Sequence, residues 1–320
     1  MPDPSINQVH VNRPLTNISV AYLQRATNFI AGTAFPRVPV SKQSDKFFTY
    51  PKEYWHRSEA KVRAPATESA GSGYSNSTDV YSANVVAVHK DIDDQTRANA
   101  DAPLDMDRDA TEWVTHQLLI KREADWVTNF FTTGIWTGST TGTDITVGTQ
   151  WGTNSSTPIE DVTAQSIAVS QNTGYKPNTL VIGPQVFDAL RHHPDIIDRI
   201  KHVQRGVVTL DLLPALFDVD RVLVPYAVQN SAVEGANASM SFLYGKHALL
   251  CYSAPSPGLL MPSAGYTFDW TGYLGANQSG SVISRFRIDL KRSDRIEGEM
   301  AYAQKVVAAD CAAFFNACVA

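Results

Sequence analysis

The sequence predicts an α+β fold in which one long helix packs against long β elements. Residues 107–133 contain neither glycine nor proline, as an uninterrupted helix requires. Residues 282–294 alternate apolar and charged side chains, which is the pattern of a strand with one solvated face. Between these regions, residues 158–278 alternate helical and strand-like segments. The long helix and the terminal β elements are therefore predicted to form one α+β layer, beside an α/β region.

Both ends of the long helix carry residues that commonly begin or end a helix. Asp107 can accept hydrogen bonds from the free N–H groups of the first turn, and Asp109 and Glu112 place negative charge near the positive end of the helix dipole. Gly134 is a natural stop, because glycine enters the left-handed region without steric cost. The predicted helix is roughly 40 Å long, from its rise of about 1.5 Å per residue. We expect a helix this long to meet other elements or other subunits along its flanks.

One face of this helix is predicted to pack against the rest of the protein. Its apolar residues recur at steps of three and four, with Gln117 as the one polar position, and Leu119, Trp126 and Phe130 widen the stripe. The predicted packing residues are Trp113, Ile120, Ala124, Val127 and Phe131.

Composition indicates a folded protein that does not bind nucleic acid tightly. Of its 320 residues, 43% are hydrophobic and 18% are charged, so a sizeable core can form and the chain is not disordered. The 27 basic and 32 acidic residues give a formal charge of −5, without the clustered cations that displace counterions from DNA. No apolar run reaches membrane-spanning length. Three cysteines without metal-ligand or redox spacing favour a reducing cytoplasm, and Cys311 and Cys318 are expected to be buried.

The first ninety residues are predicted to lie outside any core of their own. Residues 1–45 are interpreted as an extended arm with one helical piece at Ser19–Ile30, since Pro36 and Pro39 forbid a regular central strand. Residues 46–92 comprise a strand, a polar middle and a second strand, which predicts a long projecting hairpin. Such a hairpin is only marginally stable alone, so we expect it to lie across another subunit.

The hairpin carries the candidate contact residues of the chain. Its aromatic residues either pack locally or anchor the hairpin on a neighbour, and its cations either are solvated or meet an acidic surface of a partner. The candidate inter-subunit contacts are Tyr50, Lys52, Tyr54, Trp55, Arg57, Lys61 and Arg63.

The inserted α/β region is predicted in more detail. A helix at 158–173 follows Thr157 as its cap, a short buried strand follows at 179–184, and Pro194 begins the second helix of a pair. Residues 241–253 are expected to form a strand pair that turns at Gly245-Lys246. Residues 299–319 read as a second long strand, or as a strand followed by a helix.

The sequence contains no recognisable catalytic, metal or cofactor site. The nucleophile-elbow, zinc-protease, phosphate-loop, dinucleotide-binding and paired-cysteine motifs are all absent. The cluster from His89 to Asp94 is compatible with a metal or acid–base role, but a solvated strand end is the preferred interpretation. The run from His192 to Asp195 is likewise interpreted as a surface corner rather than a metal site, because adjacent histidines project apart on a helix.

The order of these parts is similar to that of the tailed-phage major capsid proteins with the HK97 fold. The resemblance is carried by LTNISVAYLQRATNFIAGTAFPRVPVSKQSDKFFTYPKEYW, by EAKVRAPATESAGSGY and by AVHKDIDDQTRANADAPLDMDRDATEWVTHQLLIKREADW. It covers nearly the whole chain and is weakest across 134–157 and 230–240. It implies an N-arm at 1–45, an E-loop at 46–92, a P-domain at 93–157 and 279–320 with its spine helix at 107–133, and an A-domain at 158–278.

The resemblance also implies a function. It implies a structural, non-enzymatic shell protein without cofactors that assembles with itself into pentamers and hexamers of an icosahedral head around double-stranded DNA. The E-loop of one subunit would lie over the P-domain of its neighbour, and the slightly acidic chain would contact the DNA weakly and non-specifically. A scaffolding protein, a portal and a decoration or cement protein are the further partners that it implies. Assembly would take place in the host cytoplasm, away from any membrane.

Departures from the family limit these expectations. The arm begins almost at Met1, so a separate scaffolding protein or none is expected, with little or no cleavage. Lys52 and Lys61 lie on the segment that is cross-linked in some members, but no matching Asn or Glu is found, and no cross-link is predicted. An encapsulin-like compartment around a protein cargo is the alternative within the fold. A soluble enzyme built on 158–278 is the alternative from another class.

Overall fold

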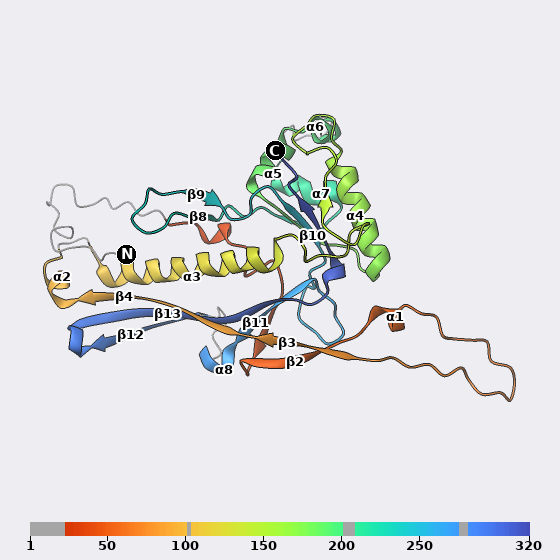
Figure 1. The fold of residues 1–320 in the computed structure, drawn as a ribbon, viewed down its shortest axis with the longest axis horizontal. Coiled ribbons are helices and arrows are strands. Elements are labelled where there is room, and N and C mark those ends of the chain that lie inside the picture. The colour runs from red at the N-terminus through yellow and green to blue at the C-terminus, as the bar shows by residue number, and fades with distance from the viewer. Residues whose placement is uncertain (1–22, 101–103, 201–208, 275–280) are drawn as a thin grey trace.

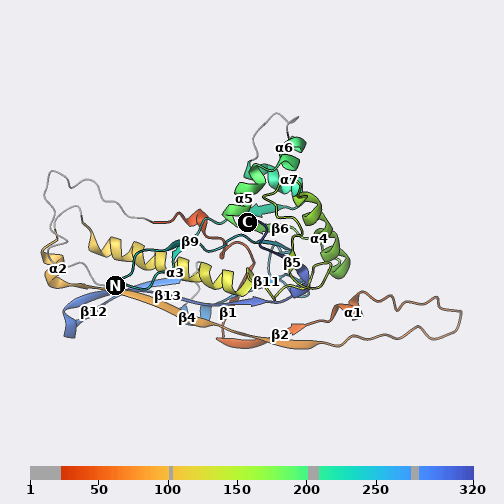
Figure 2. The same ribbon diagram turned by 45° about the horizontal axis from the view of Figure 1, so that its top comes forward.

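The computed structural model describes residues 23–100, 104–200, 209–274 and 281–320. It has an elongated part, in which the helix α3 (Met106–Phe130) lies along the long strands, and an α/β part at one end of that helix (Figure 1). Strands β2 (Ser44–Thr49) and β3 (Ser77–Ser82) form a separate ribbon, from which residues 50–76 project beyond both parts (Figures 1 and 2). No helix in the described ranges is long and apolar enough to cross a membrane.

The elongated part is built on one five-stranded sheet. The central strand β13 (Ser293–Val306) pairs antiparallel with β4 (Asn84–Asp93) along one edge, and with β12 (Ser281–Ile288) and then β11 (Gly265–Trp270) along the other. Strand β1 (Arg37–Val40) runs parallel to β11 at the sheet edge. The segment around Pro39 is therefore an edge strand, a position that tolerates proline and that agrees with the exclusion of a central strand.

Helix α3 differs from the predicted spine at both ends. Asp105 rather than Asp107 is the N-cap residue, and its Oδ1 accepts a hydrogen bond from the Arg108 N–H at 3.2 Å. The helix ends at Phe130, before the expected stop at Gly134, which does adopt a left-handed φ of 80° but lies in the following turn. The short helix α2 (Asp94–Ala98) precedes it, capped by Asp93. Residues 101–103 lie outside the described ranges.

The buried face of α3 also differs from the predicted stripe. Only Phe131, just past the helix, is fully buried among the five predicted packing residues, whereas Trp113, Ile120, Ala124 and Val127 are half-buried. Of these four, Trp113 and Val127 pack against buried clusters, as predicted. The deeply buried face includes the charged pair Arg122 and Glu123, which a hydrophobic pattern does not include. Its apolar members are Ala110, Val114, Leu118, Trp126 and Phe130.

Gly298 sets how closely α3 approaches the sheet. A Cβ atom at this position in β13 would lie 2.4 Å from Val114 Cγ1 and 2.9 Å from Leu118 Cδ1. These distances are shorter than van der Waals contact, so only glycine allows the helix to reach its observed depth.

Glu123 ties the N-terminal segment to the helix. Its carboxylate accepts hydrogen bonds from the Ile30 N–H at 2.8 Å, the Ala31 N–H at 2.9 Å and the Tyr244 hydroxyl. Burial raises the pKa of Glu123, and the same burial raises the pKa of Tyr244 well above its ordinary value. Of the predicted helix at Ser19–Ile30, residues 19–22 lie outside the described ranges, and the rest forms a single 3-10 turn at Ala26–Asn28.

The α/β part has a second five-stranded sheet. Its order is β5 (Ile145–Thr146), β14 (Ala312–Asn316), β10 (Ala248–Cys251), β6 (Thr179–Ile182) and β7 (Arg221–Leu223). The accompanying helices are α4 (Pro158–Thr173), α5 (Pro184–Arg191), α6 (Pro194–Ile200) and α7 (Leu213–Phe217). The predictions for a helix at 158–173 and for a helix beginning at Pro194 are confirmed, and the buried strand predicted at 179–184 is present but ends at Ile182.

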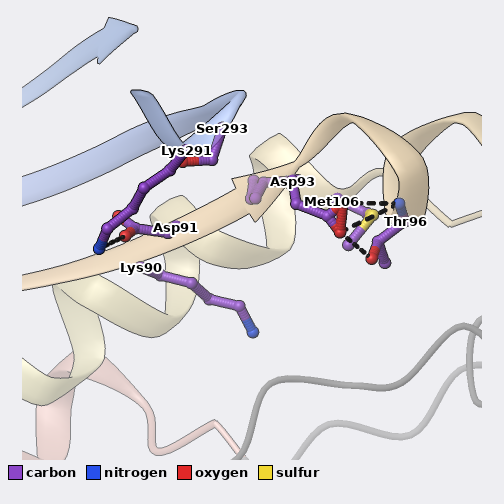
Figure 3. A pocket seen from close by; sticks show the side chains of 8 residues that line it. Lys90, Asp91, Asp93, Thr96, Met106, Lys291 and Ser293 are labelled. Carbon is purple, nitrogen blue, oxygen red and sulfur yellow. Dashed lines mark hydrogen bonds and ion pairs between the residues drawn. The ribbon is translucent and has the colours of Figure 1, made fainter. Parts of the chain in front are cut away.

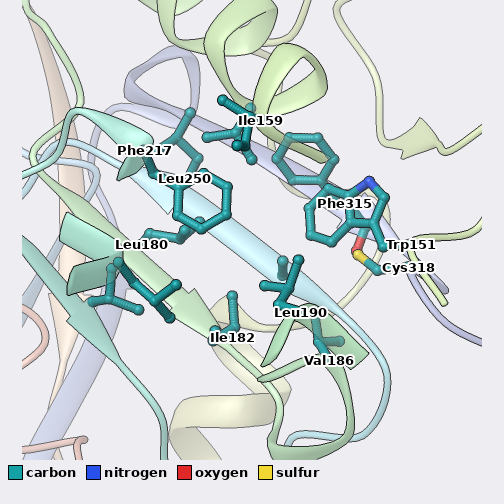
Figure 4. Packing of buried hydrophobic residues seen from close by; sticks show 14 of the residues in the cluster. Trp151, Ile159, Leu180, Ile182, Val186, Leu190, Phe217, Leu250, Phe315 and Cys318 are labelled. Carbon is teal, nitrogen blue, oxygen red and sulfur yellow. The ribbon is translucent and has the colours of Figure 1, made fainter. Parts of the chain in front are cut away.

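The packing between the strands and helices of this part is apolar. Figure 4 shows Leu180 and Leu250 on the sheet together with Trp151, Ile159, Phe217 and Phe315, all of them buried. Cys251, Cys311 and Cys318 are buried free thiols, as expected for the last two.

Three predictions in this region are wrong. Strand β14 belongs to the second sheet, so the last residues do not group with the long helix. The expected strand pair around Gly245-Lys246 is absent, because β9 (Met240–Phe242) pairs with β8 (Val228–Asn230) while β10 pairs with β6 and β14. His193 is not at the surface: it is buried, and its Nε2 lies 2.9 Å from Ser156 Oγ.

We expect Gly298→Ala to destabilise the subunit, because the added methyl group must push α3 away from β13. Overpacking of this kind costs about 1–3 kcal/mol of unfolding free energy. Denaturant unfolding of unassembled subunits measures the change. Gly152→Ala is the matched control, since a Cβ atom there meets nothing within 4 Å. Equal stability of the two variants would contradict the close-approach argument.

We also expect Glu123→Gln to lower the unfolding free energy by about 1–3 kcal/mol, because an amide oxygen cannot serve all three donors as a carboxylate does. The pKa of the folded state is raised, so wild-type stability should be greatest below the ordinary pKa of 4.5 and fall as pH rises through the folded-state pKa. Denaturant unfolding at a series of pH values measures both effects. The glutamine variant should lack this pH-dependent contribution, and an unchanged pH profile in the variant would contradict the account.

Candidate assembly surfaces

The projecting loop, residues 50–76, has no core of its own. It leaves the β2–β3 ribbon, forms one helical turn at α1 (Lys52–Trp55), and continues without regular structure to Ser77. None of its residues is buried. The loop extends away from both sheets (Figure 2). A segment this exposed gains little stability from its own subunit.

Lys52 fixes the base of the loop to its own subunit. Its Nζ lies 2.8 Å from Asp310 Oδ2 and donates to Asn172 Oδ1 at 2.5 Å. Asn172 is in the last turn of α4, and Asp310 is in the turn before β14. The charge of Lys52 is therefore already matched within the chain, and its contact with a partner stays a prediction.

The aromatic candidates form an exposed cluster near the loop base. The ring centroids of Trp55 and Tyr74 are 5.4 Å apart, and those of Tyr50 and Trp55 are 6.0 Å apart with an edge-on arrangement. Trp55 is nevertheless 52% exposed and Tyr74 is 64% exposed, with Tyr54 also exposed nearby in the chain. Local packing and a free apolar surface thus coexist at this position.

The cations farther along the loop differ in their pairing. Arg57 lies 3.4 Å from Glu59 within the loop. Arg63 donates from Nε to the Thr67 carbonyl, and it has no carboxylate partner among the described residues. Lys61 is exposed and makes no ion pair within the described ranges.

The opposite end of the molecule is held together by ion pairs. Asp294 meets Arg97, Arg285 and Arg287, which connect β13 to α2 and β12, and these guanidinium groups hold the pKa of Asp294 well below its usual range. Asp94 belongs to this network, since it pairs with Arg287 at 2.5 Å. Asp91 forms a separate pair with Arg295 at 2.7 Å.

A shallow cavity of about 300 Å³ lies beside this network (Figure 3). It is lined by Lys90, Asp91, Met106, Lys291 and Ser293, among others. Asp91 faces Lys291 at 3.5 Å, while the Asp93 carboxylate accepts the N–H groups that begin α2. The described residues contain no group of three or more side chains able to hold a metal ion.

Sequence reasoning missed Glu297 and Glu299, which lie on β13 on either side of Gly298. The alternation of apolar or small residues with glutamates along this strand could have identified them. In the structure Ile296, Gly298 and Met300 are buried, while the glutamates between them are not. The glutamates therefore point to the sheet face opposite α3. The missed contact of Glu123 had no such signal, because its three donors are far away in sequence.

Comparison with known proteins gives one consistent result. The sequence model of the family described as phage major capsid protein E matches residues 138–239. The major capsid protein of Pseudomonas phage JBD67 is 28% identical over 324 residues, covering 97% of this chain and 97% of that protein. The major capsid protein of Burkholderia phage BcepMu is 25% identical over 225 residues, covering 68% and 69%.

Solved structures agree on the fold. A phage-related protein from Bordetella bronchiseptica RB50 has a TM-score of 0.67 at 20% identity, covering 92% of this chain and 94% of that one. The capsid of cyanophage P-SCSP1u has a TM-score of 0.59 at 13% identity, covering 98% and 94%. An encapsulin complex from Synechococcus elongatus PCC 7942 has a TM-score of 0.55 at 13% identity, covering 95% and 93%.

The long helix on a long-stranded sheet, the projecting loop and the α/β part thus occur together with sequence similarity to capsid proteins along the whole chain. The chain has the HK97-like α+β fold and is similar in sequence to phage major capsid proteins.

Proposed function

We propose that this capsid protein assembles with itself into the pentamers and hexamers of an icosahedral head that encloses double-stranded DNA. The observation that carries the proposal is the projecting loop, which has no buried residue and carries an exposed aromatic cluster. In this proposal the loop acts as the E-loop and lies across the elongated part of a neighbouring subunit, which acts as its P-domain. The α/β part acts as the A-domain around the symmetry axes.

The proposal assigns no catalysis to the protein. Its work is done by interfaces, in which apolar contact areas with polar rims add up over a closed shell. The charge of −5 supports weak, non-specific contact with the packaged DNA, because tight binding requires displacement of many counterions by cations. Assembly in the host cytoplasm, with a scaffolding protein, a portal and a decoration protein as further partners, completes the proposal.

A shell around a protein cargo is the second candidate. The encapsulin complex supports it, since that structure has nearly the same coverage as the phage capsids. The two candidates differ in what purified particles contain. DNA that resists nuclease until the particles are opened supports a phage head, and a single enriched protein without such DNA supports a compartment.

Deletion of residues 57–75 tests the role of the loop. The variant keeps Lys52 and its contacts with Asn172 and Asp310, so we expect a folded subunit that forms no closed shells. Sedimentation and negative-stain electron microscopy, beside the wild-type protein expressed in the same way, measure assembly, and circular dichroism checks folding.

In a second variant, a glycine-serine linker of equal length replaces 57–75. It keeps the length of the loop and removes only its side chains, so it distinguishes the loss of loop contacts from the effect of a shorter loop. Both variants should fail to assemble. Shells of normal size from either variant would refute the role given to the loop.

A further inference from the structure

In the part of the chain that the structure describes, α3 covers one face of the sheet of the elongated part, and the opposite face is covered only in part. Gly298, Met300 and Tyr302 of β13 face α3. On the opposite face, Ala303 packs with Tyr81 and Phe47 of the β2–β3 ribbon, and Lys305 lies 3.2 Å from Asp79 of the same ribbon. The ribbon therefore covers the half of this outer face that is next to β11.

The other half of the outer face carries two carboxylates without partners. Glu297 and Glu299 alternate with Gly298 and so point away from α3. Neither carboxylate makes a hydrogen bond or ion pair with a described residue. From α8 (Thr271–Leu274) to the tip of β12 and β13, no described element crosses this half (Figure 1).

The neighbouring side chains on this face compensate the two negative charges only in part. By register, Ser284 and His89 flank Glu297, while Val282 and Ala87 flank Glu299. Among the described residues, the Arg295 guanidinium interacts electrostatically with Glu297, but its hydrogen bonds go to the two oxygens of Asp91 at 2.7 and 2.9 Å. The uncovered half is thus an acidic surface with apolar edges, including Phe286, which is 44% exposed.

The projecting loop carries two cations with the matching spacing. Lys61 and Arg63 are two residues apart within residues 58–64, which contain neither helix nor turn, and a turn follows at Pro65 and Ala66. In extended chains, residues two apart share one side and repeat every ~6.6 Å, which is also the spacing of two glutamates in positions i and i+2 of a strand. Neither cation has a carboxylate partner among the described residues.

The two charged pairs lie at opposite ends of the molecule. The loop extends beyond one end and the tip of β12 and β13 forms the other, so the loop cannot reach Glu297 and Glu299 of its own subunit (Figures 1 and 2). Contacts that join different surfaces of identical chains are head-to-tail, and they close into rings when the rotation between subunits allows.

We propose that Lys61 and Arg63 of one copy pair with Glu297 and Glu299 of the next copy, across the uncovered half of the sheet. This inference rests on the proposed assembly function and specifies the charged contact between successive subunits. Each exposed ion pair alone contributes little to the free energy of association. The loop, however, excludes water from the pairs that it covers, and two pairs in register select one orientation of the neighbouring subunit.

Charge reversal tests the proposal. Glu297→Lys with Glu299→Lys should raise the subunit concentration needed for assembly at least tenfold, and Lys61→Glu with Arg63→Glu should do the same, where tenfold corresponds to about 1.4 kcal/mol per contact. The quadruple variant restores opposite charges and should regain most of the wild-type assembly. Light scattering measures assembly, and circular dichroism confirms that each subunit is folded.

The control is Asp109→Lys with Glu112→Lys, which makes the same change in net charge on solvent-accessible acids of α3, on the other side of the sheet from the proposed contact. It should assemble at close to the wild-type concentration. The wild-type assembly should also weaken as salt is added, because salt screens exposed charges.

The outcomes separate this inference from the proposed function. If the wild-type protein forms shells and both reversed pairs do so equally well, the charged contact is refuted while the assembly function stands. Failure of the quadruple variant to assemble, with all variants folded, also refutes the pairing. If the wild-type protein never assembles, the proposed function itself is refuted.

Discussion

The packing of α3 against β13 is the contact on which the rest of the subunit depends. Gly298 allows the helix to approach the strand, and Val114 and Leu118 occupy the space that a side chain would need. Toward the other end of the helix, Glu123 joins the N-terminal segment at Ile30 and Ala31 to Tyr244 beside the second sheet. One helix thereby fixes the relative positions of the sheet, the N-terminal segment and the α/β part.

This rigid frame leaves two surfaces incomplete. The projecting loop has no buried residue, and half of the outer sheet face has no covering element among the described residues. Within the subunit, the β2–β3 ribbon already shows how an extended element covers that face, by apolar packing on Phe268 and an ion pair between Asp79 and Lys305. Covering the other half with the loop of a second copy would complete both surfaces by the same kind of contact.

Local sequence patterns predicted local structure well. The helix at 158–173 and the helix beginning at Pro194 agree with the structure, because proline at a helix start, and glycine at the end of the first helix, act within a few residues. The predicted packing face of α3 differed because Arg122 and Glu123 are buried. Their burial depends on Tyr302, Tyr244 and the N-terminal segment, which no pattern in residues 107–133 contains.

Contacts between segments that are far apart in the sequence could not be predicted from local patterns. Gly245-Lys246 has the composition of a hairpin turn, yet β10 pairs with β6 and β14 from distant parts of the chain. His193 looked like a surface residue because its buried partners, Ser156 and the Thr153 carbonyl, come from a loop almost forty residues away. Of the candidate contacts, the free charges of Lys61 and Arg63 were recognisable in sequence, whereas the capture of Lys52 by Asp310 required the fold.

Electron cryomicroscopy of purified particles tests the central claim most directly. The account predicts closed shells of five- and six-membered rings, in which residues 50–76 of each subunit cross the outer sheet face of the next subunit near Glu297 and Glu299. Discrete monomers or dimers under all assembly conditions would contradict it. Shells in which each loop contacts its own subunit alone would also contradict it.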